Sequence, residues 1–199
     1  SETSVTNSGT LNARTAYVAA TLTNEGSSSK FNVEENLVVT KAVDNAGLIT
    51  AKNADFRDTL SVQANAKVQV TETLSVAKEA FNRGTITASQ ATFSDTLNNK
   101  GEGSVVAVDN LTVGMLVNGE DSATAQITVR DLLTINSFLN NNGSIRAGSL
   151  DALGVEYLDA AGTIELSKTG VNIQSNVKNL RNSGSITTNH ALHAQTVNN

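Results

Sequence analysis

Apolar residues recur along the chain in pairs two positions apart, with one residue between them that is usually polar. Such alternation puts successive side chains on opposite faces of a strand, so each pair predicts a short, half-buried β-strand. The first members of successive pairs lie 18–22 residues apart. The pairs are Leu11/Ala13, Phe31/Val33, Ile49/Ala51, Val68/Val70, Ile86/Ala88, Val105/Ala107, Ile127/Val129, Ile145/Ala147, Ile164/Leu166 and Ile186/Thr188.

Two further apolar segments follow within each repeat. Second pairs such as Leu37/Val39 and Ala54/Phe56 come first, and a third inward residue comes later, at Leu22, Val43, Leu60, Leu97, Leu116 and Val197. Three strands per repeat close a triangular coil, and neighbouring coils pair as parallel strands at about 4.8 Å. The sequence therefore predicts an all-β, single-domain parallel β-helix (β-solenoid) over residues 1–199, with about ten coils of roughly 19 residues each.

Many positions also repeat at an offset of 37 residues, so that two coils form a larger unit. Ile49 and Ile86 are related in this way, as are Phe56 and Phe93. Side chains at equivalent positions of a solenoid stack on one another. We therefore expect Ile49, Ile86 and Ile145 in one interior column, and Phe56 and Phe93 in another, separated by one coil.

An Asn-x-Gly motif marks one corner of most coils. Glycine permits the positive φ of a tight corner, and an asparagine amide can bond its own backbone or the asparagine of the next coil. The motif thus predicts regular stacking of the corners rather than a ligand or glycan site. It occurs at Asn7/Gly9, Asn24/Gly26, Asn45/Gly47, Asn82/Gly84, Asn99/Gly101, Asn141/Gly143 and Asn182/Gly184.

Composition narrows the class of partner. The chain has no proline, cysteine or tryptophan, and its net charge of −5 offers no basic face for nucleic acid. No apolar run approaches the roughly 20 residues of a membrane-spanning helix, and the first residues lack a signal-peptide pattern, as in a mature or excised segment. We expect neither nucleic-acid binding nor membrane insertion.

The repeats resemble those of filamentous-haemagglutinin-type exoproteins. The resemblance lies in Asn-x-Gly-x-Ile-x-Ala, as in residues 45–51 and 82–88, followed by Leu-x-Val or Ala-x-Phe and then Leu-x-Asn, and it covers essentially the whole chain. It implies a right-handed β-helical shaft, exported by two-partner secretion and used in adhesion or contact-dependent competition. The double glycine common at that family's corners is mostly lacking here.

Clusters that could carry chemistry are few. His190 and His193 lie three apart, which puts them on opposite faces of a strand and argues against a metal pair. Asp55, Arg57 and Asp58 form the densest charged group, but a lyase-like site would need that group continued on adjacent coils. We interpret these three residues as solvated surface charges.

The sequence also lacks the patterns that calcium binding and ice binding would require. Calcium sites in solenoids use a glycine-rich nonapeptide with an aspartate in every repeat, which does not surround Asp44, Glu120, Asp121 or Asp131. Ice binding needs threonine at one outward position of every coil, and that position is mixed. It reads Asn12, Asn32, Thr50, Gln69, Thr87, Val106, Thr128, Arg146, Glu165 and Thr187. We predict no enzyme activity, no cofactor and no metal.

The sequence favours an extracellular structural protein on a bacterial cell surface, a subunit that stacks head to tail into a filament. The alternative is an excised shaft segment of a large secreted adhesin or contact-dependent exoprotein. The expected partner is another copy of the chain, with glycans or a host surface as a weaker hypothesis that uses the Thr/Asn-rich outer face. The predicted stacking ends are Val5, Leu11, Ala13, Ala16, Val18, Ile186, Ala191 and Val197.

Overall fold

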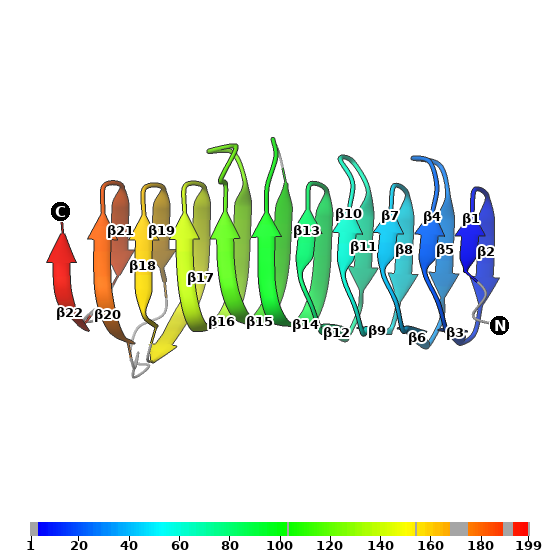
Figure 1. The fold of residues 1–199 in the computed structure, drawn as a ribbon, viewed down its shortest axis with the longest axis horizontal. Helices are drawn as coiled ribbons and strands as arrows, with labels where there is room; N and C mark the ends of the chain where they lie inside the picture. Colours follow the sequence, from blue (N-terminus) through cyan, green and yellow to red (C-terminus); the bar gives the residue numbers. More distant parts are fainter. Residues whose placement is uncertain (1–3, 103, 154, 168–174, 189–192, 199) are drawn as a thin grey trace.

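The computed structural model describes residues 4–102, 104–153, 155–167, 175–188 and 193–198. Within these ranges every regular element is a β-strand, and every pairing between strands is parallel (Figure 1). The strands are β1 (Val5–Asn7), β2 (Thr10–Ala13), β3 (Ala16–Val18), β4 (Leu22–Asn24), β5 (Lys30–Val33), β6 (Asn36–Val39), β7 (Val43–Asn45), β8 (Leu48–Ala51), β9 (Asn53–Phe56), β10 (Leu60–Val62), β11 (Lys67–Val70), β12 (Thr73–Val76), β13 (Ala80–Asn82), β14 (Thr85–Asn99), β15 (Val105–Asn118), β16 (Gln126–Asn141), β17 (Ser144–Leu153), β18 (Tyr157–Ala160), β19 (Thr163–Leu166), β20 (Ser175–Asn182), β21 (Ser185–Thr188) and β22 (His193–Asn198).

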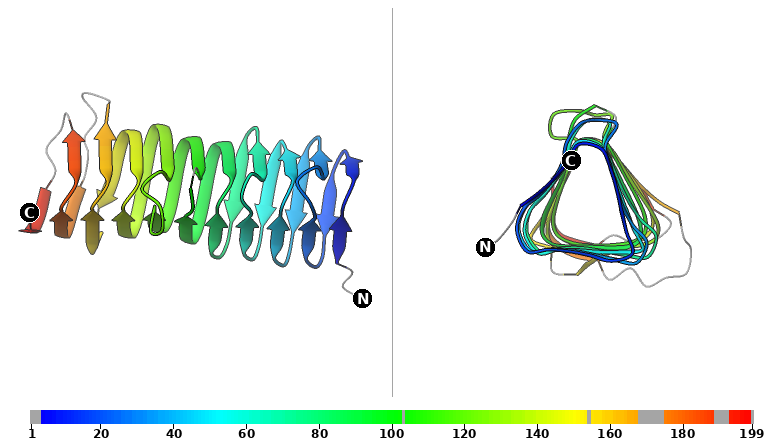
Figure 2. Two further views of the ribbon diagram at one scale, coloured as in Figure 1. Left: turned by 90° about the horizontal axis from the view of Figure 1, so that it is seen from above. Right: turned by 90° about the vertical axis from the view of Figure 1, so that its right-hand side faces the viewer.

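The strands wind around three faces, and the view along the rod is triangular (Figure 2). The first face begins with β2, β5, β8 and β11, the second with β3, β6, β9 and β12, and the third with β1, β4, β7, β10 and β13. Strands β14, β15 and β16 each continue around all three faces. The predicted single β-solenoid is confirmed, and no helix in the described residues could cross a membrane.

One interior column runs the length of the first face. Ile49, Ile86 and Ile145 all belong to it, as predicted. Its ten members are separated by nine turns of roughly 19 residues each. They are Leu11, Phe31, Ile49, Val68, Ile86, Val106, Ile127, Ile145, Ile164 and Ile186.

One predicted inward pair is wrong by a residue. Ile86 pairs with Val106, not Val105, so Val106 and Val108 are buried while Val105 and Ala107 point outward and are half-buried. The corner before β15 spans residues 100–104. It contains one residue more than a constant repeat offset of 37 residues predicts. The outward-facing residue between the two inward residues of this pair is therefore Ala107 instead of Val106.

The second face explains the 37-residue unit. Phe56 and Phe93 lie in one column with Val76 between them, as predicted. In the adjacent column Leu74 lies between two alanines, Ala54 and Ala91. Each coil therefore combines a large with a small inward residue or two of medium size, which keeps the packed volume of successive coils similar. All six side chains are almost fully buried.

The third face carries a column of eleven members, which are leucines and valines apart from one alanine. Coil length along it varies, since Leu22 follows Val5 after 17 residues whereas Leu139 follows Leu116 after 23. The extra residues lie in the corners, so the column is unbroken. It consists of Val5, Leu22, Val43, Leu60, Ala80, Leu97, Leu116, Leu139, Leu158, Leu180 and Val197.

Candidate functional site

Buried asparagines form a ladder where the third face turns into the first. In each run the amide Nδ2 of one asparagine donates to the Oδ1 of the asparagine one coil further on, at 2.7–2.8 Å. The predicted amide stacking between coils is thus confirmed. One run contains Asn7, Asn24 and Asn45, and the other contains Asn82, Asn99, Asn118 and Asn141.

A second hydrogen on each amide ties the corner to the following coil. Asn24 Nδ2 also donates to the carbonyl oxygen of Leu48 at 3.1 Å, and Asn99 Nδ2 to that of Gln126 at the same distance. A buried polar group is tolerated when its hydrogen-bonding capacity is used in this way. Asn118 belongs to the ladder but was missed by the Asn-x-Gly pattern, because its glycine follows directly as Gly119.

Two apolar residues interrupt the ladder. Val62 lies between Asn45 and Asn82, and Ala160 lies after Asn141. At the first gap Asn45 Nδ2 donates to the carbonyl oxygen of Gly47, two residues on, at 3.1 Å. The amide of Asn45, beside a gap, therefore donates to the backbone of its own corner. This is the other of the two hydrogen-bonding modes that the sequence predicted.

The glycines of these corners act in two different ways. At Gly26 and Gly101 φ is positive, at 82° and 89°, as expected. The same expectation is wrong at Gly47, Gly84, Gly143 and Gly184, whose φ is not positive. There a Cβ would collide with the backbone of the preceding coil, for example at 2.2 Å from the Ala66 carbonyl oxygen for Gly84. Close approach of the coils, rather than backbone conformation, requires glycine at these corners.

The predicted N-terminal stacking residues lie on the first described coil. Val5, Leu11 and Ala16 are partly buried and pack against the core, Ala13 is half-buried, and Val18 is only 4% exposed. Apart from the partly buried Ala88, equivalent positions in the interior coils are almost fully buried. This end of the rod therefore presents partly open apolar columns.

The predicted C-terminal residues lie on the last strands. Ile186 is partly buried against the core, whereas Val197 is 58% exposed, and Ala191 lies outside the described residues. Asn182 follows Ala160 in the ladder position, and a Cβ on Gly184 would come within 2.2 Å of the carbonyl oxygen of the preceding corner. The last corner thus keeps the geometry of the interior ones.

The charged group on the second face is a set of ion pairs. Arg57 Nε contacts Asp55 Oδ2 at 2.9 Å, and Lys78 Nζ contacts Asp58 Oδ1 at 3.1 Å. The hydrogen bond to Asp55 raises the pKa of Arg57, and the hydrogen bond from Lys78 lowers the pKa of Asp58. Both pairs are largely exposed to solvent, which fits the interpretation as surface charges.

The candidate metal ligands do not converge in the described residues. His193 lies in β22, and His190 lies outside the described part of the chain. The carboxylates lie apart, Asp44 in β7, Glu120 and Asp121 in the corner after β15, and Asp131 in β16. Within the described ranges no three histidine or acidic side chains are grouped as a metal site would require.

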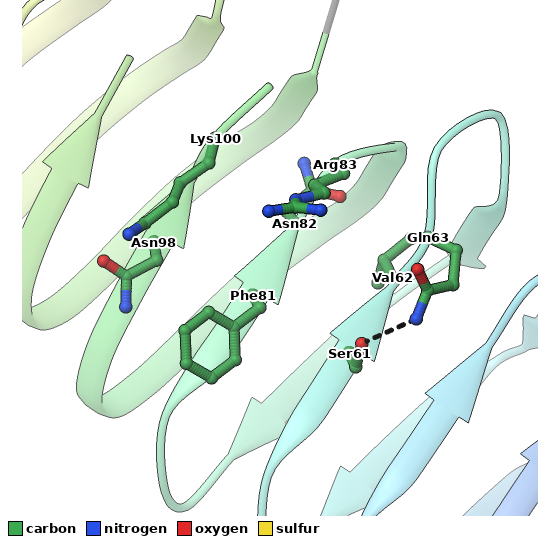
Figure 3. Close-up of a pocket in the computed structure, with 8 residues that line it drawn as sticks. All are labelled: Ser61, Val62, Gln63, Phe81, Asn82, Arg83, Asn98 and Lys100. Atoms are coloured by element: carbon green, nitrogen blue, oxygen red, sulfur yellow. Dashed lines mark hydrogen bonds between the residues drawn. The ribbon is translucent and has the colours of Figure 1, made fainter. Parts of the chain in front are cut away.

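A hollow on the third face was not predicted. It has a volume of about 260 Å³ and is lined by Ser61, Gln63, Phe81, Arg83 and Asn98, among others (Figure 3). The signal in the sequence is the position of Phe81, between the inward Ala80 and Asn82, which puts a large aromatic ring in the outward phase. Phe81 is 40% exposed.

Comparison of the chain with protein-family models, with curated proteins and with solved structures found no match.

Proposed function

We propose that the protein is a non-enzymatic structural rod on the outside of a bacterial cell. The observation that carries this proposal is the unbroken parallel register, in which the first-face column continues through ten coils without a break. Because each coil is hydrogen-bonded along all three faces to the next, bending the rod strains many backbone bonds together. A shaft is the role that such a body serves best.

The surface charges support a structural role. Most ion pairs of the described residues join neighbouring coils, such as Arg14 to Glu35 at 2.9 Å and Arg146 to Glu165 at 2.8 Å. These pairs follow the stacking direction and do not gather around one pocket. The resemblance to filamentous-haemagglutinin-type repeats supports the extracellular location and an adhesive role.

The first coil supports the idea that another coil docks on it. Gly9 occupies the corner position at which Gly47 and Gly84 are crowded by the preceding coil, yet a Cβ on Gly9 would meet nothing within 4 Å. Glycine at this corner is explained if a further coil approaches there as closely as in the interior. That coil belongs either to a second copy, in the filament proposal, or to a longer shaft of which these coils are a segment.

The third face restricts how two copies could stack. Its column has eleven members, from Val5 to Val197, whereas the first-face column has ten. Two rods therefore cannot meet flush while both β1 and β22 keep their places. In a filament of such copies one of these two strands must be displaced by the other.

The two forms of the proposal are separated by electron microscopy of the 199-residue chain. A filament protein should form fibres with an axial repeat of about 50 Å, and Gly9→Ala should abolish them without lowering the thermal stability of the monomer. Gly84→Ala is the control that should destabilise the monomer itself. Monodisperse rods at high concentration would remove the filament form and leave the shaft segment.

The extracellular role is tested on the native source. Antibodies raised against the rod should label intact cells, and the intact mass of the native polypeptide should show whether the coils belong to a longer chain. Labelling that appears only after the cells are lysed would refute the proposed location.

A further inference from the structure

The hollow on the third face is formed by three successive coils. Ser61 of β10, Phe81 of β13 and Asn98 of β14 occupy the same outward position and pair in register. The small Ser61 beside the large Phe81 leaves the aromatic ring accessible, and Figure 3 shows the ring face-on between its two neighbours. An accessible aromatic face is a platform for the C–H groups of a flat apolar ligand surface.

Two amides of the same hollow are oriented by the hydrogen bonds that they donate. Gln63 Nε2 donates to Asp44 Oδ1 at 3.0 Å and to Ser61 Oγ at 3.3 Å, and Asn98 Nδ2 donates to Glu79 Oε1 at 2.6 Å. These bonds fix the orientation of both amides. Their carbonyl oxygens, which make no hydrogen bond within the described residues, are left as acceptors for hydroxyl groups.

The same hollow contains a guanidinium group that is available to a ligand. Arg83 is exposed, and among the described residues it has no ion-pair partner. Its neighbour Lys100 differs, because the Lys100 ammonium pairs with Glu120. A guanidinium binds a carboxylate through two parallel hydrogen bonds, so Arg83 favours a carboxylate over a neutral group.

We propose that this hollow binds one acidic sugar unit, a pyranose ring that carries a carboxylate. The apolar face of the sugar packs on Phe81, the carboxylate binds Arg83, and hydroxyl groups donate to the amide oxygens of Gln63 and Asn98. Pockets for drug-sized ligands measure about 300–1,000 Å³. A hollow of about 260 Å³ therefore suits a single sugar unit of a longer saccharide.

This inference goes beyond the structural rod, because a rod without ligands would need no such arrangement. Singly exposed apolar residues are common on protein surfaces and need no explanation by themselves. Phe81 differs from Tyr17, which is also exposed, because its hollow also contains two oriented amides and a guanidinium that has no ion-pair partner in the described part of the chain. The combination matches the three chemical features of a uronic acid.

The test is a titration of the isotopically labelled 199-residue chain, followed by NMR. The probe is a tetrasaccharide of alternating glucuronic acid and N-acetylglucosamine, compared with its carboxyl-reduced, neutral form. We expect saturable shifts confined to residues around Phe81, and at least tenfold weaker binding of the neutral form. Phe81→Ala should weaken binding of both forms, whereas Arg83→Gln should remove the preference for the charged form.

Two exposed residues elsewhere supply matched controls. Tyr17→Ala removes an aromatic ring from the second face, and Lys30→Gln removes an exposed cation from the first face. Neither variant should change the titration. Equal loss of binding in Lys30→Gln and Arg83→Gln would show general charge attraction and overturn the proposal. Absence of saturable shifts with both saccharides would overturn it as well.

Discussion

Asparagine suits the corner of this solenoid because its side chain both donates and accepts. Asn99 accepts from Asn82 and donates to Asn118 at 2.8 Å, while its second N–H reaches a backbone carbonyl. Aspartate would lack the donors, and leucine would lack both functions. The residue type therefore follows from the need to satisfy buried polar groups of three coils at one point.

Replacing one rung should reveal this role. Asn99→Val removes two donated hydrogen bonds and leaves the buried Oδ1 of Asn118 without its donor. We expect a loss of about 1–3 kcal/mol in the free energy of unfolding. Asn12→Val, on the exposed first face, should change it by no more than about 0.5 kcal/mol. Equal effects in urea denaturation would contradict the role assigned to the ladder.

The corrected register supplies a second test at single residues. Val106 is fully buried and Val105 faces outward. Val106→Asp would bury an unpaired charge and should cost several kcal/mol, on the order of 3 or more, whereas Val105→Asp should be close to neutral. Thermal melting of the two variants compares them directly. The reverse order of stability would restore the register that the fixed offset predicted.

At the scale of strands and corners, the sequence predicted most of the fold. The alternation of Ile49, Thr50 and Ala51 indicates a strand with one inward and one outward face, and the spacing of the pairs indicates the length of the coil. The offset failed in the corner at residues 100–104, because an extra corner residue changes the register without changing the pattern of the strands. The hollow at Phe81 could not be predicted, since it depends on side chains from three coils and on which amide hydrogens are already bonded.

Ion pairs between neighbouring coils should make stability depend on pH. The hydrogen bond from Lys78 lowers the pKa of Asp58 below its ordinary 3.8, so the folded state favours the ionised carboxylate. This contribution is present above pH 3.8 and is lost as the pH falls through the lowered folded-state pKa. Lys78→Met should raise the pKa of Asp58 toward 3.8 in an NMR titration of its carboxyl carbon.

A second pair provides the control for that titration. The hydrogen bond from Lys178 lowers the pKa of Glu156 in the same manner. Lys178→Met should raise the pKa of Glu156 and leave that of Asp58 unchanged. A shift of both carboxyls in either variant would indicate a global change of the rod instead of two local pairs.

At the scale of the whole molecule, each coil contacts mainly its two neighbours. Stability in such a body is approximately a sum of terms between neighbouring coils, so coils at an end have fewer stabilising contacts than coils in the middle. We expect the amide protons of β14, β15 and β16 to exchange most slowly with deuterium, and those of β1 and β22 to exchange fastest. Uniform protection from end to end would instead indicate one fully cooperative unit.

The direction of the asparagine ladder has a consequence for symmetry. Every hydrogen bond between rungs points the same way, from the Nδ2 of one asparagine to the Oδ1 of a later one. The first runs from Asn7 to Asn24, and the last from Asn118 to Asn141. Each run of the ladder therefore begins with an asparagine that accepts no hydrogen bond from an earlier rung and ends with one that donates none to a later rung. A twofold-symmetric junction would reverse this direction between the two rods, whereas a head-to-tail junction would keep it. The solenoid is polar along its axis, and any assembly that repeats it in one direction has two chemically different ends.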